Sequence, residues 1–257
     1  MKTTCLLLVG LLGLGGCVQQ TTYSGADKKV VSQEVDHAAA SRERLSLGLA
    51  YLRRGNSEQA KYNFERALKH TPESADALLA MGYYFDAVKD YTRAEEYYRR
   101  SVAVVPFNPD AANNFGAFLC RQQQYEEADQ WFNRAVLAPG YIRISQTYEN
   151  LGLCAQEAGW TDKAASYYEQ ALNYNPRRAN SLLQVAELKY AAEQWDDARN
   201  YLNRYHKDGN ESAASLWLGA EMEFAANNTD AARRYGVLLL AKFPASLQAK
   251  AYRTKYY

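Results

Sequence analysis

A 34-residue period constrains this chain more than any other feature of its sequence. Three alanines stand one period apart, and each is followed four residues later by an aromatic residue and three residues after that by a small one. These sets are Ala60, Phe64 and Ala67; Ala94, Tyr98 and Ser101; and Ala128, Phe132 and Ala135. A repeat of this length indicates a solenoid of helix pairs, in which each pair packs only against its neighbours. Such a stack binds partners along an extended surface, so the period favours binding over catalysis.

Six units fit the period, and helical patterning begins near Asp36. Because no strand-like alternation is sustained, the sequence predicts a single all-α domain over residues 36–257. Its units cover about residues 41–74, 75–108, 109–142, 145–178, 179–211 and 212–245, and residues 246–257 form a capping helix. The last two units fit the pattern less well, as terminal repeats commonly do because one face has no neighbour.

The residues at the repeated positions resemble those of the tetratricopeptide repeat over the first four units. In the first unit they are Leu47, Gly48, Tyr51, Ala60, Phe64, Ala67 and Pro72. Small residues stand where two helices approach closely, and aromatic residues fill the space beside them. The resemblance implies a right-handed solenoid of six helix-turn-helix units, with Leu47 and Tyr51 on the packing face of the first helix.

The first 16 residues are typical of an export signal. Lys2 precedes an apolar run over residues 6–14, which is shorter than the roughly 20 residues that cross a bilayer. The following Gly15, Gly16 and Cys17 resemble the lipobox of bacterial lipoproteins, which implies removal of residues 1–16 and acylation of Cys17. The alternative is an ordinary secretory signal with an incidental cysteine.

Residues 17–35 would then form a lipidated amino terminus and a polar tether without helical periodicity. By resemblance to bacterial lipoprotein sorting, Val18 after the cysteine suggests delivery to the outer membrane, at its periplasmic face. The inner membrane remains an alternative, because this sorting rule differs between bacteria.

Charge and the scarcity of reactive groups exclude several classes of function. With 30 basic and 29 acidic side chains, the chain has no electrostatic footprint for nucleic acid. Its histidines, His37, His70 and His206, are far apart in sequence and lack metal-ligand spacing. Carboxylate pairs at the start of the second helices are explained by the helix N-terminus. We therefore expect no enzyme, no metal or cofactor and no small-molecule substrate.

Cys120 and Cys154 are also one period apart, on the first helices of units three and four. Packed helices lie roughly 8–10 Å apart, so facing cysteines on them can reach the Cα separation of about 4.4–6.8 Å that a disulfide requires. An exported protein enters an oxidising compartment. The spacing favours a disulfide, and the alternative is two small buried residues that never touch.

The inner face of the first helices is the expected partner-binding groove. It starts with an apolar stripe and becomes polar further along the chain. Its candidate residues are Leu45, Leu49, Leu52, Leu79, Tyr83, Asn113 and Leu153. An apolar groove mouth usually marks a partner site, and we expect an apolar helix or strand of a partner to lie across units one to three. The alternative is that residues 36–40 or a neighbouring helix cover those leucines.

The lipobox, the tether and the six units together resemble the type IV pilus biogenesis lipoproteins, the PilF/PilW pilotin family. The most specific stretches are residues 47–56, 113–119, 125–128, 148–153 and 243–246. The resemblance implies a pilotin that escorts or stabilises the type IV pilus secretin at the outer membrane. A general envelope adaptor, scaffolding peptidoglycan or outer-membrane assembly factors, is the alternative.

Overall fold

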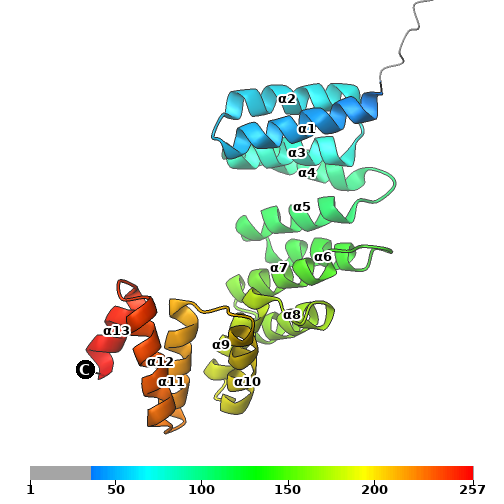
Figure 1. Ribbon diagram of the computed structural model, residues 1–257. Coiled ribbons are helices and arrows are strands. Elements are labelled where there is room, and N and C mark those ends of the chain that lie inside the picture. Colours follow the sequence, from blue (N-terminus) through cyan, green and yellow to red (C-terminus); the bar gives the residue numbers. More distant parts are fainter. Residues whose placement is uncertain (1–35, 257) are drawn as a thin grey trace, which may run out of the picture. The chain divides into compact units, whose positions relative to one another are not determined.

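The computed structural model describes residues 36–256, and this part of the chain is all-α (Figure 1). Its helices follow one another as six pairs and a final single helix, which confirms the expected repeat fold. The first three pairs are α1 (His37–Arg53) with α2 (Ser57–His70), α3 (Ala75–Ala87) with α4 (Tyr91–Ala103), and α5 (Pro109–Arg121) with α6 (Tyr125–Val136). The others are α7 (Ile144–Glu157) with α8 (Thr161–Tyr174), α9 (Ala179–Ala191) with α10 (Trp195–Lys207), α11 (Ala213–Ala225) with α12 (Thr229–Lys242), and the single α13 (Leu247–Tyr256).

The predicted leader, acylated cysteine and tether lie outside the described residues. Between residues 36 and 256, every helix is too short or too polar to cross a bilayer. The first helix begins at His37, before the start expected for the first unit, and Asp36 caps it by accepting a 2.9 Å hydrogen bond from the amide of Ala39. Residues 37–40 therefore belong to α1 and form no separate cover over its leucines.

The turn inside each pair reverses the chain through one residue with a positive φ. These residues are Gly55, Lys89, Gln123, Gly159, Glu193 and Asn227, with φ between 59° and 77°. In the first turn the amide of Asn56 donates to the carbonyl of Tyr51 at 3.0 Å, the 6→1 bond of a Schellman motif. The side chain of Asn56 then caps α2, so one short segment ends the first helix and starts the second.

The two helices of a pair meet where a small residue faces a large one 16 positions later. The glycine–aromatic pairs are Gly48 with Phe64, Gly82 with Tyr98, Gly116 with Phe132, Gly152 with Tyr168, and Gly219 with Tyr235. The fifth pair of helices instead has Ala186 and Leu202 at these positions, both fully buried. Replacing an aromatic ring by the smaller leucine leaves room for the extra methyl group of the alanine. This repeat keeps its packing although its sequence departs from the pattern.

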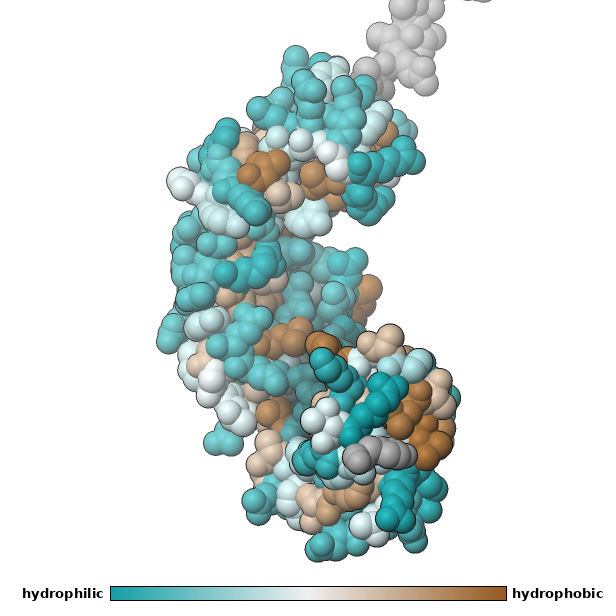
Figure 2. Space-filling model, turned by 90° about the vertical axis from the view of Figure 1, so that its left-hand side faces the viewer, coloured by the Kyte–Doolittle hydropathy of each residue, from teal (hydrophilic) through white to brown (hydrophobic). Residues whose placement is uncertain are grey.

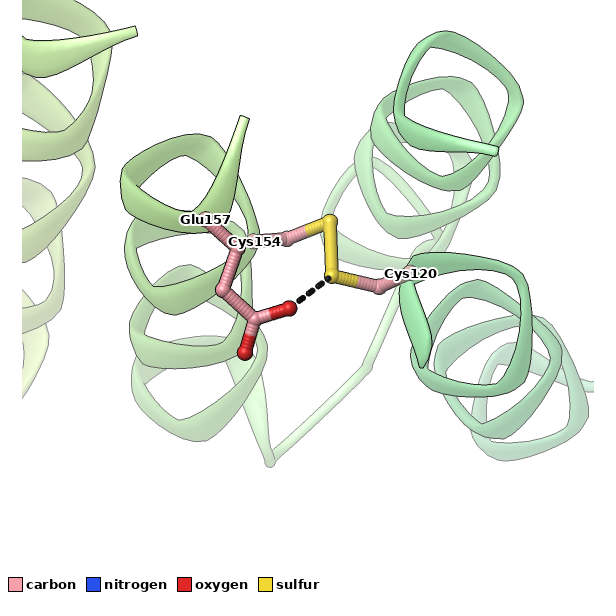
Figure 3. The surroundings of a disulfide bond; sticks show 3 residues. All are labelled: Cys120, Cys154 and Glu157. Carbon is pink, nitrogen blue, oxygen red and sulfur yellow. Dashed lines mark hydrogen bonds between the residues drawn. A yellow bond between two sulfur atoms is a disulfide. The ribbon is translucent and has the colours of Figure 1, made fainter. Parts of the chain in front are cut away.

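A disulfide joins α5 to α7, as the cysteine spacing favoured (Figure 3). The Cα atoms of Cys120 and Cys154 are 5.8 Å apart, and both side chains are buried. A carboxylate oxygen of Glu157 lies 3.6 Å from Sγ of Cys120. The third and fourth repeats are thus linked covalently as well as by packing, and the alternative of two cysteines that never touch is wrong.

Leu47 corrects one detail of the expected packing. The resemblance to the tetratricopeptide repeat predicts Leu47 beside Tyr51 on the face of α1 that packs inside the repeat, but 42% of its surface is exposed. Gly48 beside it is buried against Phe64 instead, and Tyr51 packs against the core as expected. The helix is rotated so that the glycine, rather than the leucine, makes the closest approach to α2.

Candidate partner-binding cleft

A cleft of about 710 Å³ lies along the inner face of the first repeats. Helix α1 contributes Arg42, Leu45, Ser46, Leu49 and Arg53; α3 contributes Asp76, Leu79, Ala80 and Tyr83; and α5 contributes Asn114. The lining is mostly apolar, with charged groups at several points. Figure 2 shows that hydrophobic side chains gather in small patches on a largely hydrophilic surface.

Helical spacing and the 34-residue period together build this cleft. Leu45, Leu49 and Arg53 follow one another at four-residue intervals and share one face of α1. One period later, Leu79 and Tyr83 take the places of Leu45 and Leu49 on α3. Because successive repeats stack, equivalent faces of α1 and α3 lie next to each other. The cleft is a direct consequence of an apolar stripe repeated in two neighbouring units.

Two arginines give the cleft its charge. Arg42 and Arg53 both line it and are exposed, and neither forms an ion pair with any residue in the described part of the chain. The one carboxylate in the lining, that of Asp76, accepts a 3.1 Å hydrogen bond from Asn108. The cleft therefore presents an apolar floor with two available cations.

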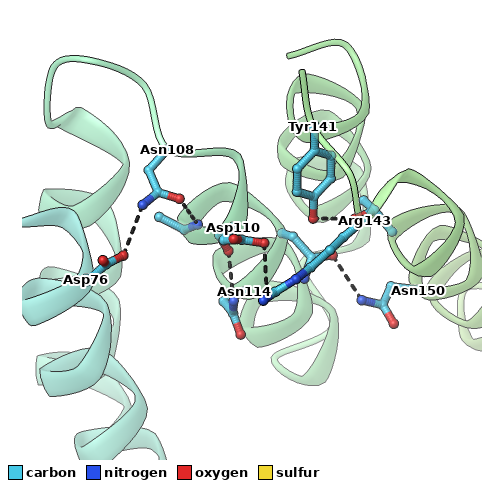
Figure 4. A network of polar contacts seen from close by, with 10 residues as sticks. Asp76, Asn108, Asp110, Asn114, Tyr141, Arg143 and Asn150 are labelled. Atoms are coloured by element: carbon cyan, nitrogen blue, oxygen red, sulfur yellow. Dashed lines mark hydrogen bonds and ion pairs between the residues drawn. The ribbon is translucent and has the colours of Figure 1, made fainter. Parts of the chain in front are cut away.

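Further along the inner face, polar side chains bond to one another across repeats (Figure 4). Arg143, which precedes α7, pairs with Asp110 of α5 at 3.1 Å. Asn150 of α7 donates to Asn113 of α5 at 3.0 Å. The first bond joins α5 to the residue before α7, and the second joins α5 to α7 itself. These groups hold neighbouring repeats together, so the polar stretch of the inner face acts in the structure as a set of cross-braces.

Beyond this stretch, the inner face carries two carboxylates with different surroundings. Glu149 is buried and bonds to Arg178 and to Ser181, the latter at 2.8 Å. Glu187, at the α9 position equivalent to Tyr83, is accepting a 3.1 Å bond from Gln184. Burial raises the pKa of Glu187, and the bond from Gln184 partly opposes this.

Of the seven predicted groove residues, the structure places Leu45, Leu49, Leu79 and Tyr83 in the cleft. The other three lie outside its lining. Leu52 packs against the hydrophobic core, Asn113 is buried in its bond to Asn150, and Leu153 is exposed on α7, beyond the cleft.

The lining residues that sequence reasoning missed are Arg42, Ser46, Arg53, Asp76, Ala80 and Asn114. The signal for several of them was present. Arg42 precedes Leu45 by three residues and Arg53 follows Leu49 by four, which places both on the face that those leucines define. A pattern of apolar side chains alone therefore omits the two arginines that flank Leu45 and Leu49 on this face.

Comparison with known proteins identifies the family. Three tetratricopeptide-repeat profiles match residues 45–109, 109–176 and 155–220. The type IV pilus assembly protein PilF of Pseudomonas aeruginosa is 32% identical to this chain over 250 residues, which cover 97% of each protein. This chain belongs to the PilF family.

Solved structures of PilF-family proteins agree with that assignment. The structure of Pseudomonas aeruginosa PilF superposes with a TM-score of 0.73 at 33% identity, covering 85% of this chain and 98% of that one. PilW, a widely conserved type IV pilus biogenesis factor, superposes with a TM-score of 0.70 at 28% identity, covering 82% and 97%. This PilF-family chain is a tetratricopeptide-repeat scaffold, and its relatives PilF and PilW are named as type IV pilus assembly and biogenesis proteins rather than as enzymes.

Proposed function

We propose that this protein is an outer-membrane pilotin, which binds, localises and stabilises the secretin of the type IV pilus while it assembles into multimers. The observation that carries the proposal is the match to PilF over 97% of both chains. The apolar cleft between α1 and α3 supplies a surface on which a partner segment binds. The lipobox-like residues before and including Cys17 supply the membrane address.

The mechanism is physical rather than chemical. An apolar segment of an unassembled secretin subunit tends to aggregate, and the cleft covers it by placing Leu45, Leu49, Leu79 and Tyr83 against it. Arg42 and Arg53 then favour a segment that carries carboxylates beside its apolar residues. Three acyl chains on Cys17 hold the complex at the membrane far more firmly than the single chain that gives only reversible binding.

Tyr83→Glu tests the cleft most directly. Tyr83 is 46% exposed, so the substitution adds a charge to the cleft without emptying the core. We expect the loss of an aromatic anchor to weaken secretin binding by about 2 kcal/mol, roughly 30-fold. Pull-down of the secretin, and the heat- and detergent-resistant secretin multimers in cells, are the measurements.

Leu47→Glu is the matched control. Leu47 is exposed to a similar extent as Tyr83, lies on the same helix as Leu45 and Leu49, and does not line the cleft. This variant should bind the secretin as the unmodified protein does. Equal affinity of the Leu47→Glu and Tyr83→Glu variants, with equal thermal stability, would refute binding in the cleft.

A general envelope adaptor for peptidoglycan or outer-membrane assembly factors is the competing function. Deletion of the gene separates the two. Loss of secretin multimers and of surface pili supports the pilotin, whereas normal pili with altered cell shape support the adaptor. Mass spectrometry of the protein from cells tests the anchor, since the pilotin carries fatty acyl groups on Cys17 and lacks residues 1–16.

A further inference from the structure

Three of the four most exposed large apolar side chains of the described residues lie in two neighbouring connections between helix pairs. Val105 is 89% exposed, Leu137 79%, Ile142 92% and Leu247 80%, whereas the next large hydrophobic side chain, that of Val237, is 59% exposed. Val105, Leu137 and Ile142 lie between the second helix of one pair and the first helix of the next, whereas Leu247 is the first residue of α13. Full exposure of several aliphatic side chains is costly in water, so this placement calls for a partner.

Connections of this kind follow one edge of a repeat stack, because all first helices run the same way and all second helices run back. We use "loop edge" for two neighbouring connections on it, residues 104–108 and 137–143. Figure 1 shows both on the side of the stack where α1 begins. The loop edge therefore lies on the same side of the stack as His37, the first residue of α1.

The number of residues between Cys17 and α1 limits how far the loop edge can be from a membrane. Eighteen residues separate Cys17 from Asp36, and a chain of this length reaches at most about 60–65 Å when fully extended. If Cys17 carries acyl chains, a lipid surface is always present near the loop edge at high effective concentration.

The exposed charges on the two edges of the stack also favour the loop edge as the side that contacts a membrane. Exposed arginines stand at or beside the loop edge: Arg134, which lies over the ring of Trp131 at 4.2 Å, and Arg143, whose side chain is 58% exposed although it pairs with Asp110. Arg177 is exposed in the next connection of the same kind. The opposite edge carries carboxylates in the first turns of the second helices, namely Glu58, Glu126, Glu127, Asp162, Asp196, Asp197 and Asp230. Anionic headgroups attract the first edge and repel the second.

We propose that the loop edge is a membrane-contact surface, through which Val105, Leu137 and Ile142 enter the headgroup region of an anionic bilayer. Arginines beside them remain at the level of the phosphates while their aliphatic stems lie along apolar surface. The contact goes beyond the pilotin function and depends on the proposed acyl anchor only for proximity. It makes the folded unit lie with its loop edge on the membrane.

The test places an environment-sensitive NBD fluorophore on one engineered cysteine at a time, in the chain from residue 18 onward. A six-histidine tag in place of Cys17 holds the protein on vesicles of phosphatidylethanolamine and phosphatidylglycerol (3:1) that contain a nickel-chelating lipid. The outcome then does not depend on acylation. The labelled variants are Val105→Cys and Ile142→Cys, with Glu126→Cys on the opposite edge as the matched control.

We expect the emission of the label at positions 105 and 142 to rise about threefold and shift to the blue on vesicle binding, and that at position 126 to stay unchanged. Adding Leu137→Asp to the Ile142→Cys variant should at least halve that rise, and circular dichroism checks that the exposed substitution leaves the fold intact. Emission at position 142 no different from that at position 126 would overturn the proposal, and an acidic protein surface would then be the better occupant. Acylation of Cys17 is measured separately, so a failed anchor and a failed contact are distinguishable.

Discussion

Gly152 of α7 lies against the ring of Tyr168 of α8, so closely that a Cβ on the glycine would come within 2.7 Å of the ring. The ring is fully buried and is held by a 2.8 Å hydrogen bond from its hydroxyl to Gln156. We expect Gly152→Ala to lower the free energy of unfolding by about 1–3 kcal/mol, because a buried ring has nowhere to move. Urea unfolding measures this, and Gln146→Ala, at an exposed site of the same helix, should change little. Equal effects of the two variants would contradict the close packing.

Removing the disulfide should destabilise the stack. Closing a 34-residue loop stabilises the folded chain by about 3–4 kcal/mol in the chain-entropy model, so Cys120→Ala with Cys154→Ala should lower the unfolding free energy by up to that amount. Reduction by dithiothreitol should lower the urea midpoint of the unmodified protein and leave that of the double variant unchanged. If dithiothreitol left the urea midpoint of the unmodified protein unchanged, this would argue against a disulfide between Cys120 and Cys154.

Two turns inside helix pairs allow opposite substitutions, one that removes a glycine and one that introduces it. Glu193 has a φ of 59° and Gly159 a φ of 77°, in equivalent turns of neighbouring repeats. A side chain in this left-handed region costs about 1 kcal/mol relative to glycine. We expect Gly159→Ala to destabilise the protein by about that amount and Glu193→Gly to be neutral or stabilising by up to about 1 kcal/mol. Thermal melts of the two variants should therefore shift in opposite directions or, for Glu193→Gly, not at all. A fall in stability for both variants would contradict this.

His206 should make the protein less stable in mild acid. Burial lowers the pKa of His206 below its usual 6.5, with Glu211 opposing this effect and Lys242 adding to it. The imidazole also bonds to Ser215 at 3.0 Å. As the pH falls, the imidazole is protonated in the unfolded chain before it is protonated in the folded one. The contribution of His206 to the free energy of unfolding is therefore fully present above pH 6.5 and is lost as the pH falls below it.

Unfolding of the protein and of its His206→Asn variant at pH 7.5 and 5.5 measures this effect. The unmodified protein should lose more stability between the two values than the variant does, since only it protonates at this site. An equal loss in both proteins would show that other groups account for the acid dependence.

The period predicted the architecture because it reports a physical need that recurs in every unit. A glycine or alanine facing a ring, as in Gly116 and Phe132, is visible in sequence as two letters 16 apart. The fifth repeat shows the limit of this signal, because Ala186 and Leu202 preserve the packing while changing both letters. The combined volume of the two facing side chains is kept, although the residue at each position changes. A pattern that considers one position at a time does not detect such a paired change.

The cleft was less predictable than the fold. Side-chain spacing placed Leu49 on the correct face of α1, but the position of Asn113 depends on Asn150 of the next repeat, which donates a hydrogen bond to its side-chain oxygen. The prediction for Leu47 is wrong because leucine and glycine are adjacent, and only the rotation of the helix decides which of them is buried. The spacing of residues within one helix determines which of them share a face, whereas the burial of that face depends on the side chains of the neighbouring helix.

The bridge between α5 and α7 has a mechanical consequence. A stack whose units touch only their neighbours can unravel from either tip, one unit after another. Under tension applied at the carboxyl end, the last repeats would peel away in turn until the strain reached the sulfur–sulfur link. The residues between Cys120 and Cys154 could then not be extended, because the disulfide bears the force in their place. The force would be transmitted through the disulfide to the repeats that form the cleft.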